Sequence, residues 1–268
     1  MERYTYPDNP DMYYDEYQIP KKNGTYRRIC APSPALLSYQ RSFLEAIESN
    51  FRMQPGSSIY HGFVKNRNCV TAANEHVGFN TTVVMDIHNF FDTVHRQKAI
   101  LLGTDYDSLD AVHRNALIAN DYFYHKDGTL AQGFATSPML ANIVLVQTTR
   151  TIDIGLKEAF GYAYRMTVYA DDIQISLNSE NYDDSYFVTE LVKEELEASG
   201  FKVHPHKTRI SYAKYGYRKI LGIGVGDNHI KPSRKVIRKI RAARHQQNGP
   251  SLGGLVNYAN LNLPRALR

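Results

Sequence analysis

The chain has 268 residues, of which 43% are hydrophobic and 22% are charged, so it can bury one large core or two smaller ones and is not wholly disordered. No apolar run approaches the roughly 18 residues that span a bilayer, and the polar, acidic N-terminus excludes a signal peptide. Two cysteines, Cys30 and Cys69, are too few for a disulfide framework. We therefore expect a soluble, cytoplasmic protein without membrane contact.

The net charge of +5 conceals an uneven distribution along the chain. Residues 201–268 contain 15 lysines and arginines and one acid, whereas residues 1–200 contain 17 basic and 26 acidic residues. A basic C-terminal part suggests a polyanionic partner such as nucleic acid. A solvated basic helix on an ordinary surface is the alternative explanation.

Hydrophobic periodicity and turn residues predict the elements of the N-terminal half. The dipeptide Asn23-Gly24 between two extended segments is typical of a hairpin, and a Ser-Pro pair is typical of a helix start. In chain order the predicted elements are a hairpin at 19–33, a helix at 34–51, a buried strand at 81–87 and a long helix at 137–160.

The C-terminal half continues this mixture of strands and helices. Two strands joined by a tight turn are expected over 165–177, and a helix over 184–200 with Asp184 as N-cap and Gly200 as stop. Further strands are expected within 201–212 and 217–230, and a helix over 233–246 with Ser233 as N-cap. Interleaved strands and helices with an antiparallel hairpin between them predict an α+β fold.

Two adjacent carboxylates, Asp171 and Asp172, lie at the turn in "TVYADDIQIS". Carboxylates at close range repel each other, and burial increases the cost unless a cation neutralises them. Mg²⁺ prefers oxygen ligands and would do so directly. A solvated acidic turn is the alternative. The stretch Tyr182-Asp183-Asp184 repeats the letters without an apolar strand before them, which favours a helix cap there.

A third carboxylate, Asp86, comes near the end of the predicted strand "TTVVMDI". Its ordinary role would be to cap the following turn. Its functional role would place it beside Asp171 and Asp172, because two-metal phosphoryl transfer uses carboxylates that hold two ions about 3.5–4 Å apart. A single turn cannot surround two ions, so one aspartate has to come from another strand.

Three ordered motifs, "DIHNFF", "QGFATSPMLAN" and "YADD", resemble the palm motifs of reverse transcriptases. The basic hairpin "IPKKNGTYRRI" is similar to the fingers hairpin of that family, and "HPHKT" and "ILGIG" resemble its fourth and fifth motifs. The resemblance covers residues 19 to 260 and implies a right-hand polymerase fold. It implies an N-terminal segment and fingers at 1–80 (basic hairpin 19–30), a palm at 81–228 with part of the fingers at 100–130, and a short, truncated basic thumb at 229–268.

The resemblance also implies an RNA-directed DNA polymerase that uses dNTPs and two Mg²⁺ ions, with Mn²⁺ as a substitute. Asp86 and Asp171 would ligate both ions with help from Asp172, and Ile87 is assigned to the same metal site. The residues assigned to nucleotide binding are Lys21, Arg27, Phe91, Gln132, Gly133 and Lys207.

Each nucleotide-binding assignment has a chemical reason. Lys21 and Arg27 would grip the triphosphate, Phe91 would exclude a 2′-hydroxyl by its bulk, and Lys207 would donate a proton to the leaving pyrophosphate. Gly133 would allow close backbone approach beside the Gln132 amide. The alternatives are a solvated hairpin, a core phenylalanine (Phe90 or Phe91) and a surface lysine.

The basic C-terminal helix has two faces. Four basic residues recur at spacings of four, three and four, and an apolar stripe of Val236, Ile237, Ile240 and Ala243 lies opposite. Such a helix docks on protein and follows phosphates without reading sequence. The basic face of this helix and three further positions, expected near the primer, make up the residues assigned to nucleic acid. They are Tyr169, Leu221, Gly222, Arg234, Arg238, Arg241 and His245.

Within the family, "QGFATSP" and "YADD" resemble the bacterial branch of retrons and defence-associated enzymes. Ala73 and His76 match the retron pattern Asn-Ala-x-x-His, Ala72 replaces its asparagine, and Leu221-Gly222 stands in place of Thr-Gly. We expect a dedicated non-coding RNA, nascent DNA and a role in antiphage defence, with a partner protein or self-association that compensates for the short thumb.

Two alternative functions stay open at this stage. One is a DNA polymerase of a defence system that works without a template or makes simple repeats. The other is a non-catalytic RNA-binding module on the same scaffold. Synthesis of RNA is disfavoured by the aromatic ring at position 91.

Overall fold

The computed structural model describes residues 1–21, 24–53, 56–98, 121–204, 206–246, 252–253 and 256. They form two compact units, each assembled from stretches that are distant in sequence. The first contains Met1–Ser58, Ile87–Thr151 and Glu195–Lys202; the second contains Ile59–Asp86, Ile152–Glu194 and Val203–Arg268. Most of the predicted segment 100–130 and of the tail after residue 246 lies outside the described residues.

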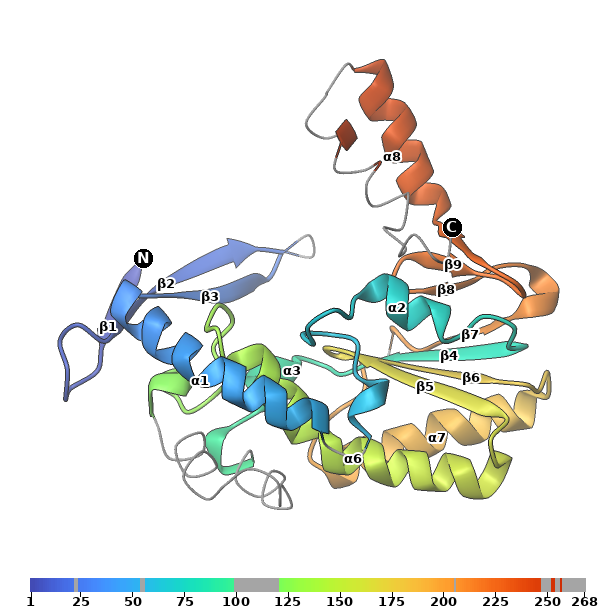
Figure 1. Ribbon diagram of the computed structural model, residues 1–268, viewed down its shortest axis with the longest axis horizontal. Coiled ribbons are helices and arrows are strands. Elements are labelled where there is room, and N and C mark those ends of the chain that lie inside the picture. Colours follow the sequence, from blue (N-terminus) through green and yellow to red (C-terminus); the bar gives the residue numbers. More distant parts are fainter. Residues whose placement is uncertain are drawn as a thin grey trace. The chain divides into compact units, whose positions relative to one another are not determined.

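The first unit begins with a three-stranded antiparallel sheet in the order β1-β2-β3 (Figure 1). Its strands are β1 (Glu2–Thr5), β2 (Tyr13–Pro20) and β3 (Tyr26–Pro32). The predicted hairpin is confirmed, since β2 and β3 pair from Tyr14↔Pro32 to Pro20↔Tyr26. β1 is not among the predicted elements, because a strand this short depends on pairing with a neighbour.

Helix α1 (Pro34–Met53) packs on this sheet and extends two residues beyond the predicted helix. The Gln40 side chain donates to the Tyr122 carbonyl oxygen at 2.8 Å, which joins α1 to the single turn η2 (Asp121–Phe123). The buried residues of this core are Tyr6, Tyr14, Cys30, Leu36, Ala131 and Phe134. The unit also contains the short helix α3 (Phe90–Thr93).

Helix α6 (Ser137–Phe160) has the predicted bounds, and its residues up to Thr151 belong to the first unit. Its C-terminus is fixed locally. Gly161 has φ +60° and donates its N–H to the Lys157 carbonyl oxygen at 2.9 Å, a helix stop that glycine adopts without strain.

The second unit is built on a four-stranded antiparallel sheet in the order β5-β6-β4-β7 (Figure 1). The strands are β4 (Thr81–Asp86), β5 (Tyr164–Tyr169), β6 (Asp172–Leu177) and β7 (Arg209–Tyr212). The prediction of two strands joined by a tight turn is confirmed. The strand expected within 201–212 is confirmed only for its last four residues.

The two faces of this sheet differ in polarity because side chains alternate along each strand. Ile173, Ile175 and Leu177 are buried and share one face of the sheet. Helix α7 (Tyr182–Ala198) lies along one side of the sheet (Figure 1). The opposite face carries polar residues and lies under α2 (Cys69–Asn74), which contacts β5 (Figure 1).

The start of α7 corrects one prediction. The helix begins at Tyr182, and the Asn181 side chain accepts the N–H of Asp183 at 3.0 Å. Asp184 is therefore not the N-cap; it lies in the first turn and accepts from the Ser179 hydroxyl at 2.5 Å. Asparagine and aspartate are equally good N-caps, so local composition alone does not choose between them.

A second small sheet in this unit has the order β10-β9-β8, with β8 (Arg218–Ile220), β9 (Ile223–Val225) and β10 (Ile230–Pro232). It packs on α2 and leads into α8 (Arg234–His245), whose N-cap Ser233 accepts from the Val236 N–H as predicted. Two single turns, η1 (Ser57–Ile59) and η3 (Ala213–Tyr215), complete the named elements. None of the helices in the described part of the chain is long and apolar enough to cross a membrane.

Candidate active site

Three carboxylates meet at one end of the four-stranded sheet. Asp86 is the last residue of β4 and Asp172 is the first residue of β6, and the two are directly opposite in the β4–β6 register. Opposed residues of an antiparallel pair have Cα atoms roughly 4.5–5.5 Å apart. Asp171 belongs to the turn that joins β5 to β6. The fold therefore brings the three predicted aspartates together from two separate strands.

The turn that carries Asp171 is held in an uncommon conformation. Ala170 has φ +57°, a left-handed value that costs a non-glycine residue about 1–2 kcal/mol. Backbone from residues 60–62 lies against it: the His61 N–H donates to the Val168 carbonyl oxygen at 2.8 Å, and a Cβ on Gly62 would lie 2.6 Å from the Ala170 nitrogen. Glycine at position 62 is thus required for this close approach, although nothing in the local sequence "YHGF" indicates it.

A lysine pairs with one of the three carboxylates. Lys207 Nζ lies 2.8 Å from Asp86 Oδ1 and 2.9 Å from Asp86 Oδ2. The His204 N–H also donates to the Asp86 carbonyl oxygen at 2.7 Å, which fixes the segment before Lys207 beside β4. Lys207, predicted as the proton donor to the pyrophosphate, therefore lies beside Asp86.

Asp172 lies close to the negative charges of Asp171 and Asp86. Burial, followed by the charges of Asp171 and Asp86, raises its pKa from the ordinary value of 3.8 to about 6. A half-buried carboxylate with two like-charged neighbours favours a bound divalent cation, and an all-oxygen set suits Mg²⁺. The donor chemistry of the three residues therefore fits the expected metal. Ile87 follows Asp86 in the chain and its side chain is buried.

A buried polar layer supports the aspartates from the α2 side of the sheet. His76 is fully buried and lies 2.8 Å from both the Ser176 and the Thr167 hydroxyl oxygens. Ser176 also contacts the Thr82 hydroxyl at 2.7 Å, and Thr167 donates to Gln174 Oε1 at 2.7 Å. Burial lowers the pKa of His76 to about 3, so the ring is neutral. These side chains were not predicted as functional, although their alternation with apolar residues is visible in the strands.

The residues assigned to the triphosphate and the base lie in the first unit. Lys21 and Arg27 are exposed on the β2–β3 hairpin, whose loop is closed by the Lys21 N–H donating to the Thr25 carbonyl oxygen at 2.7 Å. The Gln132 carbonyl oxygen accepts the Cys30 N–H at 2.8 Å. Gly133 has φ +117°, and a Cβ there would lie 2.2 Å from the Cys30 carbonyl oxygen. The backbone of 132–133 is thus pressed against β3, which also carries Arg27.

The Phe90-Phe91 pair divides into a core ring and a half-buried ring. Phe90 is buried and packs against Phe201 with ring centroids 5.6 Å apart. Phe91 is half-buried and contacts Phe90 at 5.9 Å. The structure therefore assigns the core role to Phe90 and leaves Phe91 as the candidate gate.

The residues assigned to nucleic acid lie in the second unit. Leu221 and Gly222 form the turn between β8 and β9 with φ values of +47° and +84°. On α8, Ile240 and Ala243 are buried and Val236 and Ile237 half-buried, which confirms the predicted apolar stripe. The basic residues exposed on the other face are Arg234, Arg238, Arg241 and His245. Tyr169, beside the aspartate turn, is half-buried, and burial raises its pKa.

The order of these elements corresponds to a known family. Residues 19–236 match the family model described as reverse transcriptase (RNA-dependent DNA polymerase). The chain belongs to the reverse transcriptase family. Its four-stranded sheet with the aspartate turn is the palm of the right-hand polymerase fold, and the retron-type bacterial relationship expected from the motifs is confirmed.

Several curated retron reverse transcriptases are similar to this chain. The retron Mx65 reverse transcriptase of Myxococcus xanthus is 29% identical over 274 residues, which cover 94% of this chain and 62% of that protein. The retron Mx162 enzyme of the same organism is also 29% identical, covering 88% of this chain and 53% of that protein. This reverse transcriptase chain thus spans between about half and two thirds of the length of these relatives.

Solved structures support the fold alone. Apo telomerase from Candida tropicalis, truncated from its C-terminal domain, superposes with a TM-score of 0.61 at 15% identity and covers 82% of this chain and 55% of that one. Telomerase from Candida albicans with a fragment of telomeric RNA has a TM-score of 0.60 at 12% identity, with 82% and 45% covered.

The pKa of Asp172 predicts how stability depends on pH. The folded state binds the Asp172 proton more tightly than the unfolded chain does, so this contribution is fully present below about pH 4 and is lost as pH rises through about 6. Mg²⁺ should offset the loss. We expect Mg²⁺ to raise the melting temperature more at about pH 7.5 than at about pH 5. Melting curves with Mg²⁺ or EDTA measure this, and Asp172→Asn should make the two increments equal. Equal increments in the wild type would contradict the assignment.

Proposed function

We propose that the chain is an RNA-directed DNA polymerase that adds dNTPs by two-metal nucleotidyl transfer at Asp86, Asp171 and Asp172. The observation that carries this proposal is the β4–β6 register, which sets Asp86 opposite Asp172 beside the turn of Asp171. Membership of the reverse transcriptase family supports the same chemistry. The half-buried position and raised pKa of Asp172 favour bound cations at this point.

Each carboxylate has a distinct part in this proposal. Asp86, at the end of β4, and Asp171, in the β5–β6 turn, would hold two Mg²⁺ ions, and Asp172 would add its charge beside them. When bound, such ions activate the attacking 3′-hydroxyl and stabilise the leaving pyrophosphate. Lys207 Nζ, now paired with Asp86, is within reach of the same place and supplies the proton for the pyrophosphate.

The first unit provides the nucleotide contacts of the proposal. Lys21 and Arg27 bind the triphosphate from the exposed hairpin, and the 132–133 backbone supports the base and sugar. In the second unit, the exposed basic face of α8 follows the phosphates of the template–primer duplex, with Leu221-Gly222 and Tyr169 near the primer.

A dedicated non-coding RNA and a role in antiphage defence belong to the same proposal. They are supported by the similarity to curated retron enzymes and by analogy within the bacterial branch of the family. Template-independent synthesis and a non-catalytic RNA-binding role become outcomes of the test below.

The test is to purify the protein with its bound nucleic acid from native cells, sequence that material, and measure Mg²⁺-dependent dNTP incorporation. A discrete RNA together with complementary DNA would support the proposal. A homopolymer or simple repeat would replace it with template-independent synthesis. Bound RNA without any DNA synthesis would replace it with an RNA-binding module.

The choice of sugar is tested by Phe91→Ala. Removal of the ring should reduce the preference for dNTPs over rNTPs by roughly tenfold to a hundredfold, the range that one steric contact discriminates. The measurement compares kcat/KM for both nucleotides in the wild type and the variant. Phe90→Leu is the matched control, because Phe90 is a core ring and its loss should change stability rather than selectivity. Unchanged ribonucleotide incorporation in Phe91→Ala would refute the gate.

A further inference from the structure

A second group of metal-ligating side chains lies in the first unit and contains none of the catalytic aspartates. Glu16, Cys30 and His125 each offer one donor atom, and these atoms all lie within 4.8 Å of one another. In the part of the chain that the structure describes, they are the group of three that meets this criterion. Glu16 and Cys30 are directly opposite in the β2–β3 register, so both side chains leave the same face of the hairpin.

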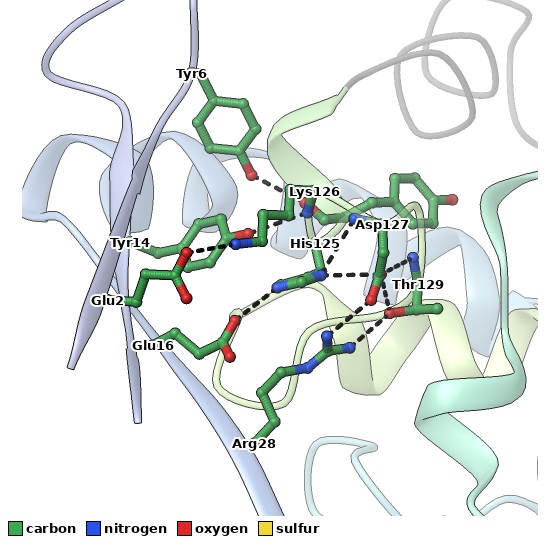
Figure 2. Close-up of polar contacts among 10 residues, drawn as sticks. Glu2, Tyr6, Tyr14, Glu16, Arg28, His125, Lys126, Asp127 and Thr129 are labelled. Atoms are coloured by element: carbon green, nitrogen blue, oxygen red, sulfur yellow. Dashed lines mark hydrogen bonds and ion pairs between the residues drawn. The ribbon is translucent and has the colours of Figure 1, made fainter. Parts of the chain in front are cut away.

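The third member comes from a tight turn that is distant in sequence. The His125 N–H donates to the Thr129 carbonyl oxygen at 2.9 Å, and the Gly128 N–H donates to the His125 carbonyl oxygen at 2.7 Å. The imidazole also packs against the Tyr14 ring, with centroids 5.4 Å apart. The turn and the tyrosine together fix the ring beside β2 (Figure 2).

We propose that Glu16, Cys30 and His125 form a zinc-binding site that ties the β2–β3 hairpin to the turn at residues 125–129. Zn²⁺ takes cysteine sulfur, histidine nitrogen and carboxylate oxygen, and three protein ligands are sufficient when water or a second carboxylate oxygen fills the fourth position. A mixed sulfur and nitrogen set disfavours Mg²⁺, so this site and the aspartate site select different metals.

The surroundings of His125 match those of a zinc ligand. Its Nε2 lies 2.9 Å from Glu16 Oε2, and its Nδ1 lies 2.9 Å from Asp127 Oδ1 (Figure 2). Histidines that bind metal commonly donate their second ring nitrogen to a carboxylate, which orients the ring. Arg28 donates to Asp127 at 2.8 Å, and despite partial burial this bond and those from Thr129 keep the pKa of Asp127 below its usual range.

The Cys30 thiol is enclosed at this site. Its side chain is 1% exposed. Burial raises the pKa of this thiol to about 12, so it carries its proton in the absence of metal. A bound cation reverses that preference because it stabilises the thiolate directly.

Zinc binding would release one proton and adjust the spacing of the donor atoms. With Nε2 on the metal, the ring proton would lie on Nδ1, which is 2.9 Å from Asp127 Oδ1 and can donate to it. The Cys30 thiol proton would leave to solvent. Tetrahedral zinc holds its ligand atoms roughly 3.3–3.7 Å apart. Donor atoms as far apart as 4.8 Å would therefore approach each other by about 1 Å, and the 2.9 Å pair of His125 Nε2 and Glu16 Oε2 would separate slightly.

The site would stiffen the region that carries the proposed nucleotide contacts. Cys30 donates its N–H to Gln132 and its carbonyl oxygen touches Gly133, and Arg27 lies three residues away on the same strand. Zinc at Cys30 thus acts on the geometry of the hairpin. Its presence can be measured independently of polymerase activity, so the zinc proposal and the proposed function can fail separately.

The test is to incubate the full chain with excess Zn²⁺, remove free metal, and measure bound zinc by mass spectrometry. The wild type should retain about one zinc per chain and release about one proton on binding. Cys30→Ser and His125→Gln should lose the bound zinc, whereas Cys69→Ser, the change at the other cysteine, should retain it. Co²⁺ in place of Zn²⁺ should give the wild type a near-ultraviolet thiolate charge-transfer band.

The cobalt spectrum tests the zinc proposal even if a variant does not fold, because it is recorded on the wild-type protein. Oxygen-only binding at the aspartates gives no thiolate band. A wild type that binds no zinc, a cobalt complex without that band, or a Cys30→Ser variant that folds and keeps its zinc would overturn the proposal. The polar contacts would then be a hydrogen-bonded network without metal.

Discussion

Asp171→Asn should lower dNTP incorporation by at least about a thousandfold, which corresponds to about 4 kcal/mol of transition-state stabilisation. The amide keeps the size of the carboxylate but removes the charge that holds the metal ions. The change also relieves the repulsion that acts on Asp172, so the melting temperature without Mg²⁺ should stay the same or rise. Activity and stability are therefore expected to move independently, which separates a catalytic role from a structural one.

The chain supplies its own control for this variant. Tyr182-Asp183-Asp184 also combines a tyrosine with two adjacent aspartates, as Tyr169–Asp172 does, but it forms the first turn of α7. Asp183→Asn removes an exposed charge near a helix N-terminus, which should cost about 0.3–1 kcal/mol of stability and leave activity within about twofold. If Asp171→Asn kept more than about a tenth of wild-type activity, the two-metal assignment would be wrong. A large fall in melting temperature instead would mean that Asp171 serves the fold.

Gly133→Ala should destabilise the protein by about 3–4 kcal/mol and weaken nucleotide binding. Its Cβ would lie 2.2 Å from the Cys30 carbonyl oxygen, and a backbone atom in a sheet cannot move aside cheaply. Overpacking typically costs about 1–3 kcal/mol, and φ +117° adds the strain of a side chain in a conformation that favours glycine. The expected cost is a large fraction of the roughly 5–15 kcal/mol that stabilises a typical protein.

Gly128→Ala separates the cost of backbone strain from the cost of the steric clash with β3. Gly128 has φ +81° in the same unit, but no atom lies within 4 Å of a Cβ placed there. It should therefore cost only about 1–2 kcal/mol of backbone strain and leave KM for dNTPs unchanged. Urea unfolding and steady-state kinetics of both variants measure the difference. Equal destabilisation by the two substitutions would show that the contact between residue 133 and β3 is unimportant.

Elements with strong local signals could be predicted from the sequence. The bounds of α6 follow from Ser137-Pro138 at its start and Gly161 after its end. The β5–β6 hairpin follows from alternating apolar residues on both sides of the two aspartates. The exposed and buried faces of α8 follow from its 3.6-residue period. In these cases, the local preference and the tertiary contacts agree.

Elements that depend on distant partners could not be predicted in the same way. β1 exists because Glu2–Thr5 pairs with the edge of β2. The turn residues Pro7 to Pro10 follow it, but four residues are too few for a strand signal of their own. Residues 201–204 have strand-like composition, but only Val203 among them forms a β-bridge, and the His204 N–H donates to the Asp86 carbonyl oxygen. The N-cap of α7 is decided by which side chain, Asn181 or Asp184, reaches a free N–H.

In the candidate site, too, some residues could be predicted from the sequence and others could not. Asp86, Asp171 and Asp172 could be found from motifs, because their chemistry requires these residue types in this order. The close approach of Gly62 to Ala170 leaves no trace in the local sequence, since the contact joins segments more than a hundred residues apart. The cluster of Glu16, Cys30 and His125 is equally hidden, because its members belong to three separate segments.

The polar layer beneath the aspartates also explains how the strands keep their alignment. Side chains alternate with a period of two, so a slip of β6 by one residue would turn Asp172 toward the apolar face and push Ser176 into hydrocarbon. His76 can bridge Ser176 and Thr167 in only one alignment, so the layer makes every shifted pairing costly. Residues that never touch a nucleotide thereby determine where the catalytic charges stand, and we expect them to vary together, as one interlocking set, when homologous chains diverge.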